Sequence, residues 1–590
     1  MHSASLTRLI IDLWHRLGHR RQYQFVSILG LMVLASMAEV ISVGAIVPFL
    51  GVLTAPERVF AHEFAQPLIR LLGATSSEDL LLPMTWTFAA TVLVAGAIRL
   101  TLAHVTTRFS YAIGADFSFE VYRRTLFQPY PVHISRNSSE IINAIYGKTA
   151  MLTGSILVPM LTLFSAIFLL CGLSLALFAL DPVLMLSIGG GLMIIYGSIL
   201  KLTRHRLKQN SEVIANESTR VIKSLQEGLG GIRDVLIDGS QAAYCAIYQS
   251  ADRPLRLAQS NNTFISASPR YVIETLGMIL IAFLAYLMSR REGGMAMAVP
   301  VLGALALGAQ RLLPVLQQAY SALAIIRGAE ASLRDTVLLL EQPLPIEADS
   351  AVPEPLPFAH GILLEDMSFS YTTGTVPVLS NIDLFLPRGK RIGFLGATGS
   401  GKSTLLDVIM GLLQPSQGSL KVDGQIIGEK NHRNWQLHVA HVPQSIYLSD
   451  SSIEENIAFG LPKNKIDSPR VRQVAKQAQI DEVIEGWPDK YQTRVGERGV
   501  RLSGGQRQRI GIARALYKRA DVIIFDEATS ALDNETERAV MQAIDSLSPD
   551  LTILIVAHRL TTLQKCDFIV ELNNGRVSRI GPYHELVNRG

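Results

Sequence analysis

The feature that most restricts the fold is a series of long apolar segments in the first half of the chain. Six of them are long enough to cross a membrane, because a helix rises about 1.5 Å per residue and must cover about 30 Å of hydrocarbon. They lie at 25–50, 81–107, 152–180, 183–202, 271–289 and 297–326. Only Asp181 and Pro182 separate the third from the fourth, so these two form a hairpin. The sequence therefore predicts an all-α transmembrane domain of six spans over residues 1–340.

Lysine and arginine residues indicate the orientation of these spans. The segment 1–24 holds four of them, the loop 108–151 five and the loop 203–269 eight, whereas 51–80 holds two. Positively charged loops are retained on the cytoplasmic side of a membrane. The N-terminus, both long loops and everything after the sixth span are therefore predicted to be cytoplasmic.

Four shorter segments complete the predicted outline of the first part of the chain. Each long loop is expected to extend two membrane helices into the cytoplasm, joined by a short crosswise helix near 132–141 in the first loop and near 231–241 in the second. Residues 56–73 have apolar side chains at helical spacing with charges between them, which indicates an external amphipathic helix. Residues 341–358 are rich in proline and acidic residues and are predicted to be a linker.

Residues 359–590 alternate between apolar and polar in the manner of a soluble α/β domain. The whole chain has a formal net charge of +4, which is small and scattered, so nucleic acid is not an expected partner. The three cysteines lie far apart and suggest neither a disulfide framework nor a metal site.

A glycine-rich loop follows an apolar run in RIGFLGATGSGKSTLL. It matches the P-loop pattern, with Gly396, four residues, and then Gly401, Lys402 and Ser403. Backbone N–H groups of such a loop converge on phosphate oxygens at a helix N-terminus. The predicted nucleotide-binding residues are Gly396, Ala397, Thr398, Gly399, Ser400, Gly401, Lys402, Ser403 and Thr404. The domain is thus predicted to be an α/β P-loop NTPase that binds ATP and Mg²⁺, with Lys402 on the β/γ-phosphates and Ser403 on the metal.

Two further buried strands end in polar residues suited to phosphoryl transfer. Asp526 follows Val522 to Phe525 and is placed to hold Mg²⁺, and Glu527 can polarise the attacking water. His558, after ILIVA, could contact the γ-phosphate and orient Glu527. Glu527 and His558 are therefore the predicted catalytic residues.

Two residues outside these strands complete the predicted site. Gln444 follows a short strand and could join the Mg²⁺ or water shell. Tyr371 lies 25 residues before the P-loop, where its ring could stack on adenine, although core packing is the alternative for this tyrosine.

A second glycine-rich turn occurs about a hundred residues after the P-loop, in RLSGGQRQRIGIARAL. Ser503, Gly504, Gly505 and Gln506 lead directly into a predicted helix. This turn is therefore another helix N-terminus suited to a phosphate. Because the chain already has a complete phosphate loop, the second turn is best explained by a nucleotide bound elsewhere.

These motifs resemble the ATP-binding cassette family in identity and in order. The resemblance implies that the second turn closes over the nucleotide held by the opposite subunit's P-loop, and it adds Asp533, from the run Ser530 to Asp533, to the nucleotide site. One cassette per chain implies a half-transporter, and the intact catalytic positions favour a homodimer. Six spans fused before the cassette are typical of exporters. The loop TRVGERG, 493–499, is similar to the one that contacts the crosswise helices.

The substrate must be inferred from ionisable residues within the spans, which are costly there and usually functional. Arg99, Arg270 and Arg311 are the predicted substrate-binding residues, since a guanidinium fits phosphate oxygens. The alternative for Arg99 and Arg270 is that they reach an interface or pair with Glu39 or Glu274. The residues themselves indicate only an anionic amphiphile.

The segment HISRNSSEIINAI, the external helix and the arginines resemble bacterial lipid-linked oligosaccharide flippases. That resemblance implies a polyprenyl-pyrophosphate-linked glycan as cargo, membrane lipid as a partner and the bacterial inner membrane as location. Two alternatives stay open: a multidrug or lipid A exporter, and a channel or regulator that is gated by ATP without pumping.

Overall fold

The computed structural model describes most of the chain in side-chain detail. The chain folds into two compact units, one formed by 1–128 with 135–345 and the other by 129–134 with 346–590. The described residues are 5–54, 57, 60, 76, 78–180, 182–289, 294–345, 348, 353–372, 376–527, 534–557 and 560–587, and some side chains near helix ends inside these ranges, including that of Arg311, are outside the description.

The described part of the first unit is helical. Its α-helices are α1 (Leu6–His15), α2 (His19–Gly44), α3 (Ile46–Thr54), α6 (Leu81–Leu126), α8 (Ser138–Ile142), α9 (Thr149–Met151), α10 (Val158–Leu180), α11 (Pro182–Gly230), α12 (Ile232–Ile237), α13 (Gln241–Ser289), α14 (Gly294–Gly328) and α15 (Glu330–Leu340). Two π-helical turns, Asn143–Lys148 and Leu152–Leu157, flank α9. A short 3₁₀ turn, Glu78–Leu80, precedes α6.

The predicted spans coincide with helices, and the first of them, 25–50, is divided between α2 and α3 by a turn at Ala45. Among the described residues, three helices are long and apolar enough to cross a membrane, namely His19–Gly44, Leu81–Leu126 and Ser138–Ala176. The other three predicted spans fall within α11, α13 and α14, parts of which are outside the description. The predicted external helix at 56–73 also lies outside the described residues, apart from Glu57 and Phe60.

The long helices extend well beyond the length that a membrane requires. Helix α11 has 49 residues and is therefore roughly 70 Å long at about 1.5 Å per residue, more than twice the hydrocarbon thickness. The second half of α11 carries the charged residues that hydrocarbon would exclude. Helix α12 lies inside the range predicted for the second crosswise helix, and α7 (Tyr130–Ser135) starts two residues before the range predicted for the first.

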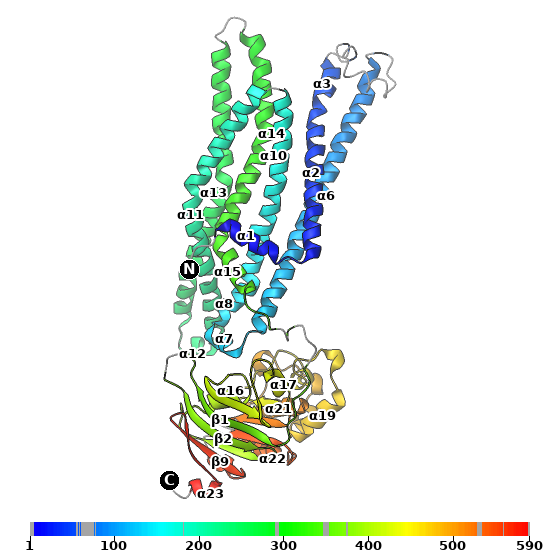
Figure 1. Ribbon diagram of the computed structural model, residues 1–590. Helices are drawn as coiled ribbons and strands as arrows, with labels where there is room; N and C mark the ends of the chain where they lie inside the picture. Colours follow the sequence, from blue (N-terminus) through cyan, green and yellow to red (C-terminus); the bar gives the residue numbers. More distant parts are fainter. Residues whose placement is uncertain are drawn as a thin grey trace. The chain divides into compact units, whose positions relative to one another are not determined.

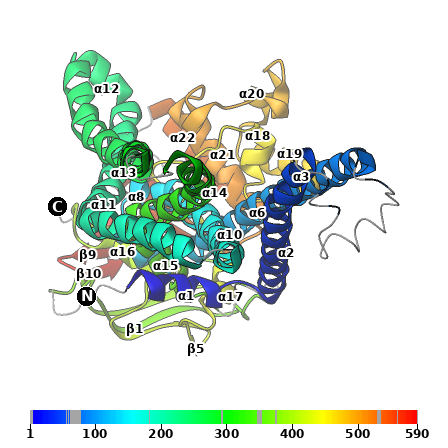
Figure 2. The ribbon, with the colours of Figure 1, turned by 90° about the horizontal axis from the view of Figure 1, so that it is seen from above.

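The helices of the first unit pack side by side as a bundle. Helix α14 contacts α10, α11 and α13, helix α11 also contacts α10 and α13, and α2 contacts both α6 and α10 (Figures 1 and 2). Helix α1 runs across the direction of the long helices (Figure 1). Its Leu9 and Leu13 are buried in the same apolar cluster as residues of α2, α6 and α15. This arrangement buries the apolar stripe of a short amphipathic helix.

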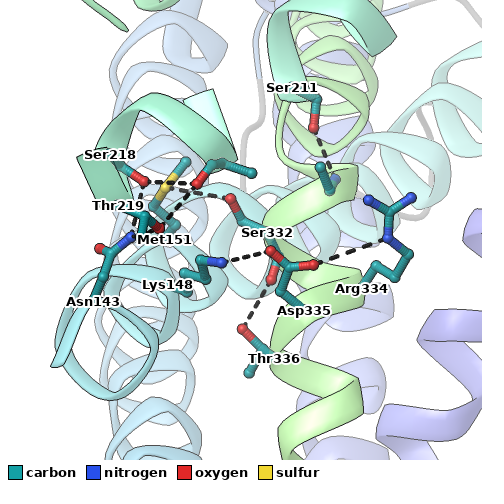
Figure 3. A network of polar contacts seen from close by, with 12 residues as sticks. Asn143, Lys148, Met151, Ser211, Ser218, Thr219, Ser332, Arg334, Asp335 and Thr336 are labelled. Carbon is teal, nitrogen blue, oxygen red and sulfur yellow. Dashed lines mark hydrogen bonds and ion pairs between the residues drawn. The ribbon is translucent and has the colours of Figure 1, made fainter. Parts of the chain in front are cut away.

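A polar network joins three helical segments of this unit (Figure 3). Asn143 in the first π-helical turn donates from Nδ2 to the Ser218 and Thr219 hydroxyls of α11, at 3.0 and 2.8 Å. Lys148 Nζ, at the end of that turn, lies 2.5 Å from Asp335 Oδ2 of α15. The turn is thereby tied to one helix at each of its ends.

The second unit contains two sheets. The antiparallel sheet has the order β2-β1-β4-β5 and the other sheet the order β10-β9-β3-β8-β7-β6. The strands are β1 (Gly361–Phe369), β2 (Leu379–Pro387), β3 (Arg391–Leu395), β4 (Gln417–Val422), β5 (Gln425–Ile426), β6 (Val439–Val442), β7 (Val522–Asp526), β8 (Thr552–Val556), β9 (Phe568–Asn573) and β10 (Arg576–Gly581). Strands β9, β3, β8, β7 and β6 are parallel, and β10 is antiparallel to β9.

Two apolar cores hold the second unit together. The first lies between the sheets, where α16 (Lys402–Ile409) packs among strand residues of both and Phe394 is fully buried. The second covers the other face of the parallel sheet with helices. The helices of the second unit, apart from α7 and α16, are α17 (His432–Gln436), α18 (Ile453–Ile457), α19 (Ser468–Gln477), α20 (Asp481–Glu485), α21 (Gly504–Tyr517), α22 (Asn534–Asp545) and α23 (Tyr583–Val587). A sheet with apolar layers on both faces explains the continuous apolar runs of its strands.

The Lys148–Asp335 pair yields a test of the polar network. The side chains are only 13% and 29% exposed, so breaking the pair leaves a charge with little access to water. We expect Lys148→Met to lower the stability of the first unit by about 1.5–3 kcal/mol, the range for hydrogen bonds to charged groups. The measurement is the thermal unfolding midpoint of the detergent-purified protein. The double variant with Asp335→Asn should lose less than the sum of the single variants.

Lys223→Met is the matched control for this prediction. Lys223 faces Glu227 at 3.8 Å on α11, but both side chains are about half exposed. Exposed ion pairs contribute little, so this variant should unfold at nearly the wild-type midpoint. Equal effects of the two lysine variants, or strictly additive losses in the double variant, would contradict a stabilising role for the Lys148–Asp335 contact.

Candidate functional site

The predicted nucleotide residues gather at one edge of the parallel sheet. Strands β3, β8, β7 and β6 are neighbours and run in the same direction, so the residues that follow them emerge at the same carboxyl edge. The P-loop follows β3, Asp526 ends β7, and Gln444 comes two residues after β6. Ligands of open parallel sheets bind at this edge. The pairing of the strands thus joins three motifs that are far apart in the sequence.

The P-loop turns sharply between β3 and α16 because two glycines permit it. Gly401 is the N-cap of α16 with φ of 98°, and a Cβ atom there would lie 2.7 Å from Leu379 Cδ2. Gly396 leaves no more room, since its Cβ would lie 2.4 Å from Leu572 O. Residues Ala397, Thr398, Gly399 and Ser403 are exposed around the start of α16. The loop therefore presents a helix N-terminus to solvent, which is a site for an anion.

Lys402 is held inside the loop that precedes it. Its Nζ donates to the carbonyls of Gly396 and Ala397, at 2.7 and 3.0 Å. The residue is 7% exposed. Burial lowers the pKa of the Lys402 ammonium, and the nearby Glu527 and Asp526 carboxylates act in the opposite direction. A phosphate group bound in the loop would place negative charge beside the Lys402 ammonium group.

Ser400 provides an independent indication that the loop fits a ligand. Its hydroxyl oxygen is buried and makes no hydrogen bond to any described residue. A buried hydroxyl without a partner costs about 1–3 kcal/mol. An oxygen-rich ligand in the P-loop would satisfy it, so the residues present are compatible with a bound phosphate.

Glu527 lies beside the P-loop lysine in a restrained backbone conformation. Its φ is 49°, a left-handed value that is unusual for a residue other than glycine. The Glu527 N–H donates to Val556 O of β8 at 3.0 Å, and Gln444 Nε2 donates to Glu527 Oε2, also at 3.0 Å. Strained residues of this kind concentrate at functional sites. The carboxylate is thus oriented by one backbone contact and one side-chain contact.

Tyr371 lies at the other side of the P-loop helix. Its hydroxyl is 3.2 Å from Thr404 Oγ1, and its ring meets Phe369 edge-on at 5.0 Å. The tyrosine is 51% exposed. A tyrosine that is half exposed is not a core residue, and its contact with adenine stays a prediction.

The second glycine-rich turn forms the start of α21. Ser503 is the N-cap, and its hydroxyl accepts from the Gln506 N–H at 3.2 Å while Gln506 Oε1 accepts from the Ser503 N–H at 2.9 Å. This capping box occupies the Gln506 side chain within its own turn. Among the described residues, the turn makes no hydrogen bond to the P-loop of the same chain. Each chain therefore has a phosphate loop and a separate second turn.

Of the other predicted site residues, three lie outside the description and two arginines pair with carboxylates. His558 and Asp533 lie outside the described residues, as does the Arg311 side chain in α14. Arg99 of α6 faces Glu39 of α2 at 3.5 Å, and Arg270 lies 2.8 Å from Glu274 one turn along α13. Both arginines thus have carboxylate partners, as their alternative interpretation expected. Their role in substrate binding stays a prediction.

Sequence reasoning missed Asp407, a carboxyl group on α16. Burial, with a smaller contribution from the Asp526 charge, raises the pKa of Asp407 from 3.8 to about 6. The residue interrupts the apolar run Leu405, Leu406, Val408 and Ile409, all of which are buried. The sequence offers only an acidic residue within an apolar run as a signal, and the burial of that residue depends on the folded chain.

Comparison with known families extends these observations to the whole chain. Residues 379–530 match the model of the ABC transporter family, and residues 25–297 match the ABC transporter transmembrane region. An ATP-dependent lipid A-core flippase of Cupriavidus pinatubonensis is 30% identical over 510 residues, which cover 84% of each chain. The protein belongs to the ABC transporter family. It has an exporter-type helical domain followed by an ATP-hydrolysing nucleotide-binding domain.

Other relatives place it among ABC exporters. The ATP-dependent lipid A-core flippase of Saccharophagus degradans is 30% identical over 522 residues, which cover 85% of each chain. ATP-binding cassette sub-family B member 5 of the mouse is 43% identical over 226 residues, 38% of this chain and 18% of the mouse protein. The structure of a bacterial Atm1-family ABC exporter with ATP bound aligns with a TM-score of 0.75 over 97% of both chains. At 22% identity, that likeness concerns the fold alone.

The position of Glu527 predicts its effect on ATP turnover. Glu527→Gln keeps the size of the side chain and an oxygen that can accept from Gln444, but it removes the base. The kcat for ATP hydrolysis should therefore fall by about 10²–10⁴-fold, the usual contribution of general base catalysis. ATP binding, measured with a fluorescent nucleotide, should be retained. The control is Glu365→Gln, on the antiparallel sheet, which should hydrolyse ATP normally. Hydrolysis by Glu527→Gln at the wild-type rate would assign the base elsewhere.

The raised pKa of Asp407 predicts a pH dependence of stability. The folded state keeps the Asp407 carboxyl group protonated up to about pH 6, whereas the unfolded chain does so only up to about pH 3.8. The contribution of this protonated group to the free energy of unfolding is therefore lost as the pH rises from 3.8 to about 6. Asp407→Asn should therefore be more stable than wild type at pH 7, and the difference should shrink toward pH 4. Thermal midpoints of both proteins across this range, without nucleotide, provide the measurement. A difference that is constant with pH would contradict the burial of this carboxyl group.

Proposed function

We propose that two copies of this exporter form a homodimer that uses ATP to flip an anionic, phosphate-bearing amphiphile outward across the bacterial inner membrane. The first candidate for the cargo is a polyprenyl-pyrophosphate-linked oligosaccharide. The observation that carries the proposal is the pair of incomplete ATP half-sites in one chain. The P-loop and the second turn each bear groups suited to phosphate, and within the described part of the chain they form no hydrogen bond with each other.

The separation of those half-sites supports a dimer. The Ser503 cap on one chain closes over the nucleotide held by Lys402 of the other, which creates two composite sites. Closure would bring the two nucleotide-binding domains together. The crosswise helices, α7 and α12, would pass that movement to the spans, and hydrolysis would reverse it.

The reaction itself uses groups already positioned at the sheet edge. Lys402 exchanges its loop carbonyls for phosphate oxygens, and Glu527 accepts a proton from the attacking water. Gln444 holds the Glu527 carboxylate in place. A bound Mg²⁺ would neutralise phosphate charge, and the hydroxyl, amide and carboxylate oxygens of Ser403, Gln444 and Asp526 are hard ligands suited to holding it.

The cargo is inferred from arginines within the apolar helices. The Arg99 side chain is 69% exposed although it lies in the middle of a predicted span. Such a charge is tolerated where it faces a water-filled cavity. Arg99 and Arg270 each have a glutamate partner that a doubly charged pyrophosphate could replace, and the guanidinium fork fits its oxygens. Arg311 would add a third cation from α14.

A second candidate cargo is supported by the relatives named as lipid A-core flippases, which align with most of this chain. That cargo is also a glycolipid, so the architecture and the arginines suit it as well. The two candidates differ in the anionic group that the cavity must bind. A direct transport assay separates them.

The test is flipping in proteoliposomes with ATP. Wild-type protein should move a fluorescent pyrophosphate-linked glycan, and Arg311→Ala should move it about tenfold more slowly, the effect of losing roughly 1.4 kcal/mol of binding. Arg311→Lys keeps the charge without the fork and should lie between the two. Arg256→Ala, which removes an exposed partner of Asp252 outside the predicted spans, is the matched control and should flip normally.

Each alternative gives a different result in this assay. Movement of lipid A-core but not of the pyrophosphate-linked glycan would favour the second candidate, and movement of hydrophobic drugs alone would indicate a multidrug exporter. ATP-dependent ion conductance without flipping would indicate a channel. Normal flipping by Arg311→Ala would remove the argument for an arginine-bound phosphate.

A further inference from the structure

We infer that Gln508 is a positioning residue for ATP hydrolysis, because it fixes the segment that carries Gln444 to the helix that begins at the second glycine-rich turn. The inference goes beyond the proposed cargo and does not depend on it. The proposed dimer is needed only for the coupling between the two nucleotide sites. Gln508 would act on the reaction through Gln444.

The contact is a single hydrogen bond from a buried side chain. Gln508 Nε2 donates to the Gln444 carbonyl at 2.9 Å, and Gln508 is 7% exposed. Its Oε1 atom is buried and has no hydrogen bond among the described residues. A buried amide with one unsatisfied atom is unfavourable compared with an apolar side chain of the same size. Packing alone therefore does not account for a glutamine here.

Two further residues of α21 extend this contact along the same segment. A Cβ atom on Gly511 would lie 2.5 Å from Ile446 Cδ1, so the absence of a side chain lets Ile446 pack directly on the helix. Arg514 Nη1 donates to the Tyr447 carbonyl at 3.0 Å. The Arg514 side chain is also fixed by Asn456 O, at 2.9 Å from Nε. Residues 508, 511 and 514 are spaced at three-residue intervals and so lie on one side of the helix.

The three contacts follow the segment in order. Gln508 meets residue 444, Gly511 meets 446 and Arg514 meets 447. The segment is thus attached to α21 over its length rather than at one point. The side chain of Gln444, at the start of this segment, donates from Nε2 to the Glu527 carboxylate.

The same helix therefore links two different nucleotides in the dimer. Its first residue, Gly504, follows the Ser503 cap, which would contact the γ-phosphate held by the partner. A helix of 14 residues is about 21 Å long and moves as a rigid rod. A phosphate that pulls on the cap would shift Gln508, and with it the Gln444 contact to Glu527 of the chain's own site. Gln508 thereby couples occupation of one site to the geometry of the other.

The experiment measures basal ATP hydrolysis by the full-length protein in lipid nanodiscs without cargo. Gln508→Met keeps the volume and removes the donor. We expect kcat to fall about fivefold, which corresponds to the loss of one hydrogen bond in the hydrolysing state, with KM for ATP within about twofold of wild type. Gln508→Lys restores a donor of similar reach and should recover most of kcat.

Arg509→Met is the matched control. Arg509 is the next residue of α21 and also donates to a backbone carbonyl, but to Gln479 O at 2.7 Å, away from the Gln444 segment. Its loss should leave kcat within about twofold of wild type. Thermal midpoints of all variants show whether the assay temperature lies below unfolding.

Three outcomes would overturn the inference. They are a wild-type kcat in folded Gln508→Met, an equal fall in Arg509→Met, and a failure of Gln508→Lys to restore kcat. Because no cargo is present, a negative flipping assay would leave this test unaffected. Conversely, a wild-type kcat in Gln508→Met would overturn the positioning role without bearing on the cargo.

Discussion

The ATP site depends on the parallel pairing of β3, β8, β7 and β6. That register brings Lys402, Asp526 and Gln444 to one edge although more than a hundred residues separate the first from the second. The apolar layers on both faces of the sheet fix the strands, and the polar residues follow the carboxyl ends of those strands. The desolvated lysine, the strained glutamate and the orphaned Ser400 hydroxyl are all consequences of crowding these groups at that edge.

A second constraint is the length of the helices relative to a membrane. Helices α6, α11 and α13 have 46, 49 and 49 residues, whereas about 20 suffice to cross the hydrocarbon. The excess is polar and includes Ser218 and Thr219 of α11, which accept hydrogen bonds from Asn143. Movement at one end of such helices reaches the other because a helix transmits displacement along its axis. In the sequence, the short helix α7 follows α6, and the short helix α12 lies between α11 and α13.

Much of this architecture could be predicted from the sequence, for identifiable reasons. Span positions follow from segment length, and the P-loop and Asp526-Glu527 follow from patterns that few other functions require. The capping box of Ser503 and Gln506 was also readable, because a serine and a glutamine three residues apart before a helix form its signature. Asp407 and Gln508 were not predicted, because their roles arise from neighbours that only the folded chain supplies. The π-helical turns differ from α-helix by one residue per turn, which leaves no periodic signal.

Those π-helical turns also bear on how the helix tolerates insertions. Asn143–Lys148 and Leu152–Leu157 each accommodate one residue more than an α-helical turn would. A π-helical turn takes one residue more than an α-helical turn to complete about the same rotation, so the helical segments on its two sides keep their facing. Excision of a single residue between Asn143 and Lys148 would therefore convert the turn to α-helix while both side chains still face α11 and α15. Relatives that are shorter by one residue at this point could accordingly join the same three helices through the same contacts.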